Sequence, residues 1–302
     1  MEIYAGIDGG GTGTTLRVES VDRTYVEEYR FGAFNINSIG RERFVRRLEE
    51  IFTQVKECGT CTTLCIGAAG ISNQETRSIL EENVKKWLPY TKLKLMGDHE
   101  IALYGATKGD IGAILIAGTG SICSGILESG AIVRAGGYGH LIDDLGSGYS
   151  IGKDALYAIM CGEDGRGEET ILTDLIKKQL KVTTIIEIVK VVHEASDKSV
   201  VASLSRQVEE AAKQGDSVAS SILEQNAHHL LELVKAVCKK IVESKQSSQE
   251  EGIPLVLMGG MIANDTRLKE ILLRKIALEV PYVVVKTSLL NAVEGAVLVA
   301  KA

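Results

Sequence analysis

The sequence has neither an excess of basic residues nor a long apolar run. Lysine and arginine number 34 against 40 aspartates and glutamates, which gives a net charge of -6, and no basic cluster offsets it. This charge argues against a general nucleic-acid-binding protein. No apolar run is long enough to span a bilayer, and Met1-Glu2-Ile3 starts without the basic segment and apolar stretch of a secretion signal. We therefore expect a cytoplasmic protein with no membrane and no nucleic-acid partner.

Cysteine is scattered along the chain rather than clustered as in a metal site. There are six cysteines, and the C-x-x-C pattern is Cys58-Gly59-Thr60-Cys61. No second pair or nearby histidine completes a zinc site, and the pattern precedes a predicted strand rather than opening a helix. We interpret it as an ordinary loop. Cys65 and Cys123 fall in predicted strands and Cys238 on the apolar face of a predicted helix, as is typical of reduced, buried thiols.

The chain is long enough for two domains, and its pattern of predicted strands restarts at residue 111. Of the 302 residues, 45% are hydrophobic and 25% charged, as in ordinary globular proteins. After a strand–turn–strand opening, we predict strands at 25–31, 62–68 and 92–96, and helices from Ser38 through Val55, from Ser72 or Asn73 to Trp87, and from Asp98 onward. Strands at 111–117, 122–127 and 131–135 then repeat the opening pattern. This duplication predicts two similar α/β domains facing each other.

The rest of the chain is largely helical as far as residue 243. The apolar stripe from Leu223 to Ile241 is typical of a helix that faces a core. Residues 244–252 are polar, and we expect an exposed loop there. A strand at 254–258, a helix capped by Asn264 or Asp265, a strand at 282–285 and a helix at 291–301 complete the prediction.

The most informative stretch is the glycine-rich turn that runs from Asp8 to Thr15, between two apolar runs. Its four glycines allow positive φ and close approach, so that successive N–H groups can face a phosphate. The hydroxyls of Thr12 and Thr14 add donors. Asp8 would repel a phosphate unless a cation lay between them, and Mg²⁺ is the usual one. A glycine-rich hairpin without a ligand is the alternative.

Two other phosphate motifs do not fit this turn. The G-x-x-x-x-G-K-[ST] loop requires a lysine, and none follows the glycines. The dinucleotide pattern requires a helix next, whereas Thr14 to Val18 reads as a strand. The turn therefore predicts a phosphate loop of a different class.

Three glycine sites follow three predicted strands, at residues 9–13, 118–120 and 259–260. Together with Asp8 and Asp98 at strand ends and Gly295 in the last helix, they resemble the superfamily of actin, heat-shock chaperone ATPases and sugar kinases. The resemblance implies an α/β fold of two ribonuclease H-like (actin-like ATPase) domains with a nucleotide cleft between them. The implied domains are residues 1–108 and 109–302. The second carries a helical insert at about 150–245, and the last helix, at about 290–302, packs back toward the first.

Within that superfamily the chain is most similar to the N-acetylglucosamine kinase group of the BadF-type ATPase family. The residues that carry this likeness are Asp8 to Thr12, Asn35, Asp98, Ala117 to Ser121 and Gly136 to His140. The family usually continues into Gly-Asp-Glu-Gly-Ser, but here Asp143, Asp144 and Leu145 precede Gly146-Ser147. Gly13 stands where lysine or arginine is common, and Tyr138 where tryptophan is common. These departures leave the identity of the sugar open.

The resemblance also implies the site residues. Asp98 is the catalytic base for the attacking hydroxyl, and Asp8 holds Mg²⁺ through water. The residues expected to bind the phosphates and adenosine of ATP are Gly9, Gly10, Gly11, Thr12, Thr14, Gly118, Thr119, Gly120, Ser121, Gly259 and Gly260. Those expected to bind the sugar are Asn35, Asp98, Thr119, Gly137 and Asp144. For Asp98, a plain helix N-cap is the alternative role.

These features predict an ATP-dependent kinase that phosphorylates a hydroxyl of a hexose or amino sugar, of the N-acetylglucosamine or glucosamine type. The expected partner is a small sugar, and a homodimer is possible for this class of protein. The alternative is the branch of the BadF-type ATPases that activates a dehydratase or reductase through an iron–sulfur cluster shared across a dimer. A non-catalytic sugar sensor is a third hypothesis.

Overall fold

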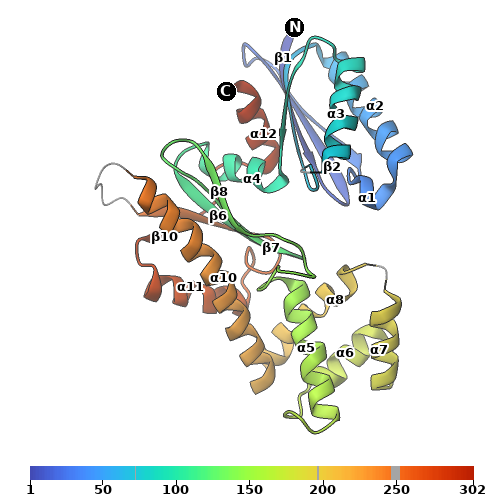
Figure 1. Cartoon of the computed structure of the whole chain (residues 1–302), viewed down its shortest axis with the longest axis vertical. Helices are drawn as coiled ribbons and strands as arrows, with labels where there is room; N and C mark the ends of the chain where they lie inside the picture. The colour runs from blue at the N-terminus through green and yellow to red at the C-terminus, as the bar shows by residue number, and fades with distance from the viewer. Residues whose placement is uncertain (72, 196, 246–251) are drawn as a thin grey trace. The chain divides into compact units, whose positions relative to one another are not determined.

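The computed structural model describes residues 1–71, 73–195, 197–245 and 252–302. The chain forms two compact units (Figure 1). Unit 1 comprises Met1–Ile111 and Thr287–Ala302, and unit 2 comprises Gly112–Lys286. Within the described residues, no helix is both long and apolar enough to cross a membrane.

Unit 1 is built on a five-stranded mixed sheet. Its strands are β1 (Glu2–Gly9), β2 (Gly13–Ser20), β3 (Val26–Gly32), β4 (Thr60–Ala68) and β5 (Lys92–Met96), in the order β3-β2-β1-β4-β5. β1, β2 and β3 are antiparallel neighbours, whereas β4 and β5 run parallel to β1. Burial alternates strictly along β2, as expected for a strand with one face on the core.

Helices cover both faces of this sheet. They are α1 (Ile36–Ile39), α2 (Arg41–Cys58), α3 (Gln74–Trp87), α4 (Asp98–Thr107) and α12 (Ala292–Lys301). The side chains of α2 and α3 form one core with Ile3, Ala5 and Ile7 of β1. Those of α4 and α12 form a second core around Cys65 on the opposite face. Figure 1 shows α2 and α3 on one side of the strands and α12 on the other.

The last helix is held in unit 1 by two glycines. A Cβ at Gly295 would lie 2.0 Å from the carbonyl oxygen of Ile101, and one at Gly105 would lie 2.3 Å from that of Asn291. α4 and α12 can therefore cross this closely only because both positions lack a side chain.

Unit 2 repeats the sheet of unit 1. Its strands are β6 (Gly112–Ala117), β7 (Ser121–Ile126), β8 (Ile132–Gly136), β9 (Ile253–Met258) and β10 (Val283–Lys286), in the order β10-β9-β6-β7-β8. Here β6 takes the place of β1, and the mixture of antiparallel and parallel pairs is the same. The predicted duplication is thus confirmed.

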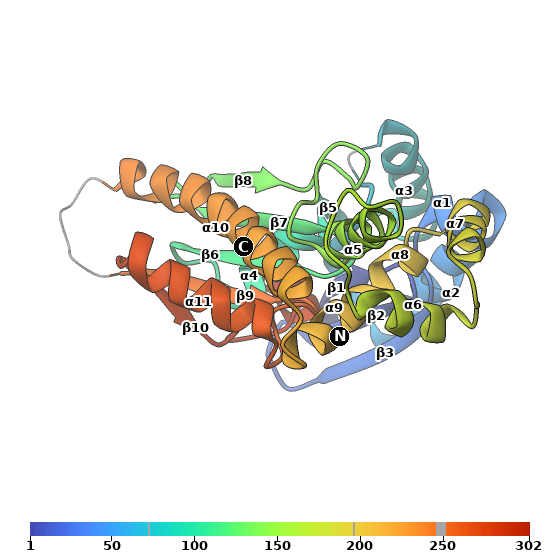
Figure 2. The same ribbon diagram turned by 90° about the horizontal axis from the view of Figure 1, so that it is seen from below.

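The described part of the connection between β8 and β9 is mainly helical. Its helices are α5 (Gly148–Glu163), α6 (Leu172–Leu180), α7 (Ile185–Glu194), α8 (Ser199–Ser203), α9 (Ser205–Lys213) and α10 (Ser217–Ser244), and α11 (Arg267–Glu279) follows β9. The apolar stripe of α10, from Leu223 to Ile241, is buried as predicted. This helix packs along the side of the sheet that β6, β7 and β8 form (Figure 2).

Two predicted helix starts are wrong. Ser38 lies inside the short α1, and α2 begins after Gly40, whose φ of 76° reverses the chain. Thr266, rather than Asn264 or Asp265, caps α11, because its side chain accepts the N–H of Lys269. Asn73 caps α3 as one of the two predicted choices. The other choice, Ser72, and residues 246–251 of the predicted 244–252 loop lie outside the described residues.

The cysteines are free and buried, as predicted for Cys65, Cys123 and Cys238. Cys58 ends α2 and Cys61 lies in β4. Burial raises the pKa of the Cys61 thiol to about 12, which leaves it protonated at neutral pH.

Candidate active site

The first glycine turn joins β1 to β2 as predicted, but its glycines are needed for a different reason. None of Gly9, Gly10, Gly11 and Gly13 has a φ in the left-handed region. The requirement is space, since a Cβ at Gly9 would lie 2.4 Å from Cδ1 of Phe34. The backbone N–H of Phe34 also donates to the carbonyl of Gly10 (3.0 Å). Phe34 therefore packs against the base of the turn.

The outer face of this turn is open. Gly11 and Thr12 are exposed, and a Cβ at Gly11 would meet no atom within 4 Å. Within the described residues, the backbone N–H groups of these two residues have no hydrogen-bond partner. They can therefore serve as donors to an anion.

Thr14 does not fit its predicted role. Its side chain is buried, and its hydroxyl donates to the carbonyl of Gly32 (2.7 Å). A hydroxyl has one hydrogen, so this group cannot also donate to a phosphate. The prediction of Thr14 as a phosphate donor is wrong, because the residue ties β2 to β3.

The structure brings Asp8 and Asp98 to the same edge of the sheet. Asp8 is level with Gly67 of β4, and Gly67 is level with Met96 of β5. Asp98 follows Met96 by two positions, so the carboxylates flank the end of β4. Burial raises the pKa of Asp8, and the negative charge of Asp98 raises it further. The register of β1, β4 and β5 thus places the two negative charges near enough to interact.

Asp98 is held as an ionised carboxylate. Burial acts to raise its pKa, but hydrogen bonds from the side chain and backbone of His99 outweigh this effect, and the pKa lies below the ordinary 3.8. The backbone N–H of His99 donates to Oδ1 at 2.9 Å. The Asp98 side chain is 52% exposed, so a ligand can reach it.

The N-cap alternative for Asp98 is wrong. The N-cap of α4 is Gly97, whose N–H donates to the Glu100 carboxylate (2.6 Å). Asp98 is the first residue of the helix, where the positive end of the helix dipole favours an anion. The sequence alone assigned no role to His99 or Glu100. The signal for Glu100 was its position three residues after Gly97, which is typical of a capping box.

Asn35 lies beside the first turn because Phe34 is anchored there. Its carbonyl accepts the N–H groups of Ser38 and Ile39 (both 3.0 Å), which starts α1. Unit 1 thus gathers four predicted elements at the carboxyl edge of its sheet: the glycine turn, Asp8, Asn35 and Asp98.

The second glycine turn, between β6 and β7, is closed by backbone contacts. The N–H of Gly118 donates to the carbonyl of Gly120 (2.9 Å), and the N–H of Gly148 donates to that of Gly118 (2.8 Å). Thr119 is exposed at its tip. Ser121 is buried, and its hydroxyl donates to the carbonyl of Leu145 (2.7 Å). As with Thr14, the Ser121 hydroxyl is therefore not free to donate to a phosphate.

Asp144 lies against this second turn. A Cβ at Gly120 would be only 2.7 Å from its Oδ2 atom. Asp144 is 5% exposed, yet its carboxylate accepts no hydrogen bond within the described part of the chain. Its oxygens are not among the fully buried unpaired atoms of the described residues, so a ligand hydroxyl can reach the carboxylate. Gly137, with φ 75°, packs against Ile122 of β7.

The third glycine site, Gly259-Gly260, packs against the start of the second turn at Ala117. Gly259 has a φ of 89°, and a Cβ there would lie 2.4 Å from the carbonyl oxygen of Ala117. The N–H of Met261 donates to that same carbonyl (3.0 Å). Gly260 faces open space. Unit 2 therefore brings residues 117–121, Asp144 and 259–260 together.

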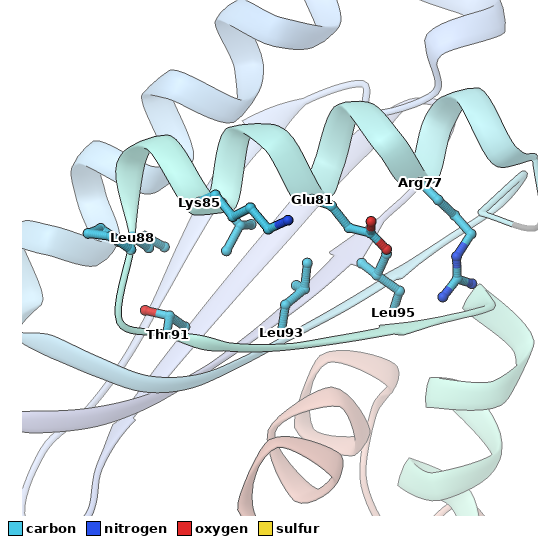
Figure 3. A pocket seen from close by; sticks show the side chains of 9 residues that line it. Arg77, Glu81, Lys85, Leu88, Thr91, Leu93 and Leu95 are labelled. Carbon is cyan, nitrogen blue, oxygen red and sulfur yellow. The ribbon is translucent and has the colours of Figure 1, made fainter.

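A separate groove of about 390 Å³ lies between α3 and β5 of unit 1. Figure 3 shows Arg77, Glu81 and Lys85 on the helix, facing Leu93 and Leu95 on the strand. None of the predicted site residues lines it. Among the described residues, no cluster of three or more His, Cys, Asp or Glu side chains could hold a metal ion.

Comparison with known families shows which family the chain belongs to. The sequence model of the BadF/BadG/BcrA/BcrD ATPase family matches residues 5–300. The chain belongs to this family. Membership implies the use of ATP, and the match extends over both units.

Named relatives align over the whole chain. An N-acetylmuramic acid/N-acetylglucosamine kinase from Clostridium acetobutylicum is 34% identical over 100% of this chain and 99% of its own length. An N-acetyl-D-glucosamine kinase from Dictyostelium discoideum is 29% identical over 99% of this chain and 98% of its own length.

A solved structure shows the same fold. It is that of a candidate N-acetylglucosamine kinase from Chromobacterium violaceum, which superposes with a TM-score of 0.72 at 23% identity and covers 99% of this chain and 98% of its own. The fold of this ATPase-family chain is thus the α/β fold of actin-like ATPases and sugar kinases, as predicted.

Proposed function

We propose that the chain is an ATP-dependent kinase that phosphorylates a hydroxyl of an amino sugar, of the N-acetylglucosamine or glucosamine type. The observation that carries the proposal is Asp98, an accessible and ionised carboxylate at the edge of the sheet beside Asp8 and the first glycine turn. Both full-length relatives named above are kinases of such sugars. We also propose a cytoplasmic location.

In this proposal Asp98 is the general base. Because its pKa lies below 3.8, it is ionised at neutral pH and can accept the proton of the attacking sugar hydroxyl. His99 keeps the carboxylate in place through its N–H. Asn35, Thr119, Gly137 and Asp144 would bind the other polar groups of the sugar.

The glycine turns would bind the nucleotide. Phosphoryl transfer depends mainly on positioning and on stabilising charge on the phosphate oxygens. The open amides of Gly11 and Thr12 suit phosphates, and no protein atom within 4 Å obstructs a ligand that approaches the backbone at Gly118 or Gly260. Gly9, Gly120 and Gly259 would contribute by allowing the backbone to pack closely.

Asp8 would hold Mg²⁺ through water. Asp8 and Asp98 repel each other, and a hard cation with oxygen ligands would relieve this repulsion. When bound, the ion would neutralise charge on the phosphates of ATP.

Replacing Asp8 by Asn should raise the thermal stability of the metal-free protein at pH 7, by on the order of a few degrees. Burial and the charge of Asp98 raise the folded pKa of Asp8, so ionisation disfavours the folded state. This penalty is complete above the folded pKa and absent below 3.8, where the carboxyl is protonated in both states. Melting curves in EDTA should show that the difference in melting temperature between the variant and the unaltered protein shrinks as the pH falls toward 3.8. Equal melting temperatures at pH 7 would contradict the repulsion.

A coupled assay of ADP release tests the function directly. Glucose, glucosamine, N-acetylglucosamine and N-acetylmuramic acid are each added to the protein with ATP and Mg²⁺. We expect sugar-dependent ADP release with at least one amino sugar, together with a phosphorylated product in the mass spectrum. ATP hydrolysis that no sugar stimulates, with iron in the purified protein, would instead favour the activator branch of the family.

A further inference from the structure

A buried asparagine on α10 holds the segment that carries Asp144. Asn226 is 0% exposed, and its Oδ1 accepts the backbone N–H of Gly146 (3.1 Å) and the hydroxyl of Ser150 (2.9 Å). Its Nδ2 donates to Oδ2 of Asp154 (2.7 Å) and to the carbonyl of Ile222 (2.9 Å). The amide thus uses both of its donors and both acceptor positions.

The segment that Asn226 holds is strained. Asp144 has a φ of 59°, an uncommon conformation for a residue with a side chain, and Gly146 has a φ of 83°. Gly146 also packs against α10, since a Cβ there would lie 2.4 Å from Cγ of Leu230. Such conformations persist only where several contacts enforce them.

The same segment is tied to the second glycine turn from its other side. The Leu145 carbonyl accepts the Ser121 hydroxyl, and the Gly148 N–H donates to Gly118. These bonds leave the backbone of residues 118–121 attached to the segment even without Asn226. The contribution of α10 is therefore the conformation at Asp144 and Gly146 rather than the shape of the turn.

We propose that Asn226 is a positioning residue for the sugar. By fixing Gly146 and Ser150, it keeps the unpaired Asp144 carboxylate directed at Gly120, where a substrate hydroxyl can donate to it. Asn226 is fully buried and acts through Asp144. The inference rests on the proposed kinase function.

Replacing Asn226 by Ala tests it. The change removes the acceptor of Gly146 and Ser150, so Asp144 can leave its strained conformation. We expect the KM for the sugar to rise on the order of tenfold or more. The Kd for an ATP analogue, measured calorimetrically without sugar, should stay within about twofold.

Asp216→Ala is the matched control. Asp216 caps the same helix, where it accepts the N–H of Ala219 (2.7 Å), and it also accepts the hydroxyl of Thr170 (2.9 Å). Its loss weakens the start of α10, ten residues before Asn226, and removes no contact of residues 144–150. We expect lower thermal stability with an unchanged KM for the sugar.

Exchanging the amide of Asn226 and the carboxylate of Asp154 tests whether Asn226 positions the segment or only fills space. Asn226→Asp alone places two carboxylates against each other, and we expect the sugar KM to rise as in the alanine variant. Adding Asp154→Asn restores a donor–acceptor pair across this contact, and most of the sugar affinity should return. Ser150→Ala removes one of the two bonds to Oδ1 and serves if the alanine variant does not fold; its KM should rise by a smaller factor.

The outcomes are distinguishable. If the unaltered protein phosphorylates a sugar and Asn226→Ala has the same KM, the inference is wrong and the kinase function stands. An equal loss of sugar and ATP affinity would show that Asn226 only supports the fold of unit 2, which also overturns the inference. If the unaltered protein phosphorylates no sugar, the proposed function fails and the inference fails with it.

Discussion

Asp98→Asn should lower kcat for sugar phosphorylation by about 10²–10⁴-fold, the range that a positioned general base contributes. Asparagine keeps the shape of the side chain and can still accept the N–H of His99, but it cannot take the proton of a hydroxyl. The measurement is the initial rate with saturating sugar, together with the Kd of an ATP analogue. We expect the Kd to change little, because Asp98 is not part of either glycine turn.

Asp110→Asn is the control for this experiment. Asp110 is an exposed aspartate of the same unit that follows α4 and lies outside the predicted site. Its replacement should leave both kcat and the Kd unchanged. Turnover near the unaltered level in the Asp98 variant would show that another group accepts the proton.

Gly11→Val should weaken ATP binding by about 10- to 100-fold without lowering the melting temperature. A side chain at Gly11 meets no protein atom within 4 Å, and its backbone is not left-handed, so the folded chain can accept valine. The new methyl groups would occupy the space in front of the open amides of Gly11 and Thr12. An overlap of this kind costs roughly 1–3 kcal/mol. Calorimetric titration with an ATP analogue measures the effect.

Gly10→Val provides the contrast. Its Cβ would lie 2.9 Å from the carbonyl oxygen of Gly13, the acceptor of the Gly10 N–H, so this variant should lose both stability and ATP affinity. Thr12→Val removes a hydroxyl at nearly constant volume and should weaken binding by a smaller factor. An ATP affinity unchanged in the Gly11 variant would remove the first turn from the phosphate site.

The local pattern was sufficient to predict most strands, the turns between them and the duplication. Alternating burial along β2 and the apolar runs of β1 and β6 are properties of short stretches, and they appear directly in the sequence. The turn at Gly9 to Gly13 was located correctly, although its glycines meet a requirement for space rather than for positive φ.

Helix caps and hydroxyl roles were less predictable. Asn264, Asp265 and Thr266 are all good capping residues, and the choice depends on how the chain leaves β9. The hydroxyl of Thr14 bonds to Gly32, eighteen residues away, and no local pattern indicates that contact. A hydroxyl near a predicted site can thus join two strands instead of binding a ligand.

The sequence by itself determined the fold class, the two glycine turns and the carboxylates at the strand ends, because each depends on neighbouring residues and their period. Only the tertiary structure decided which groups meet. The approach of Asp8 to Asp98 requires the order β1-β4-β5, and the hold of Asn226 on Gly146 joins positions 80 residues apart. Packing sets such distances, and packing depends on the whole chain at once.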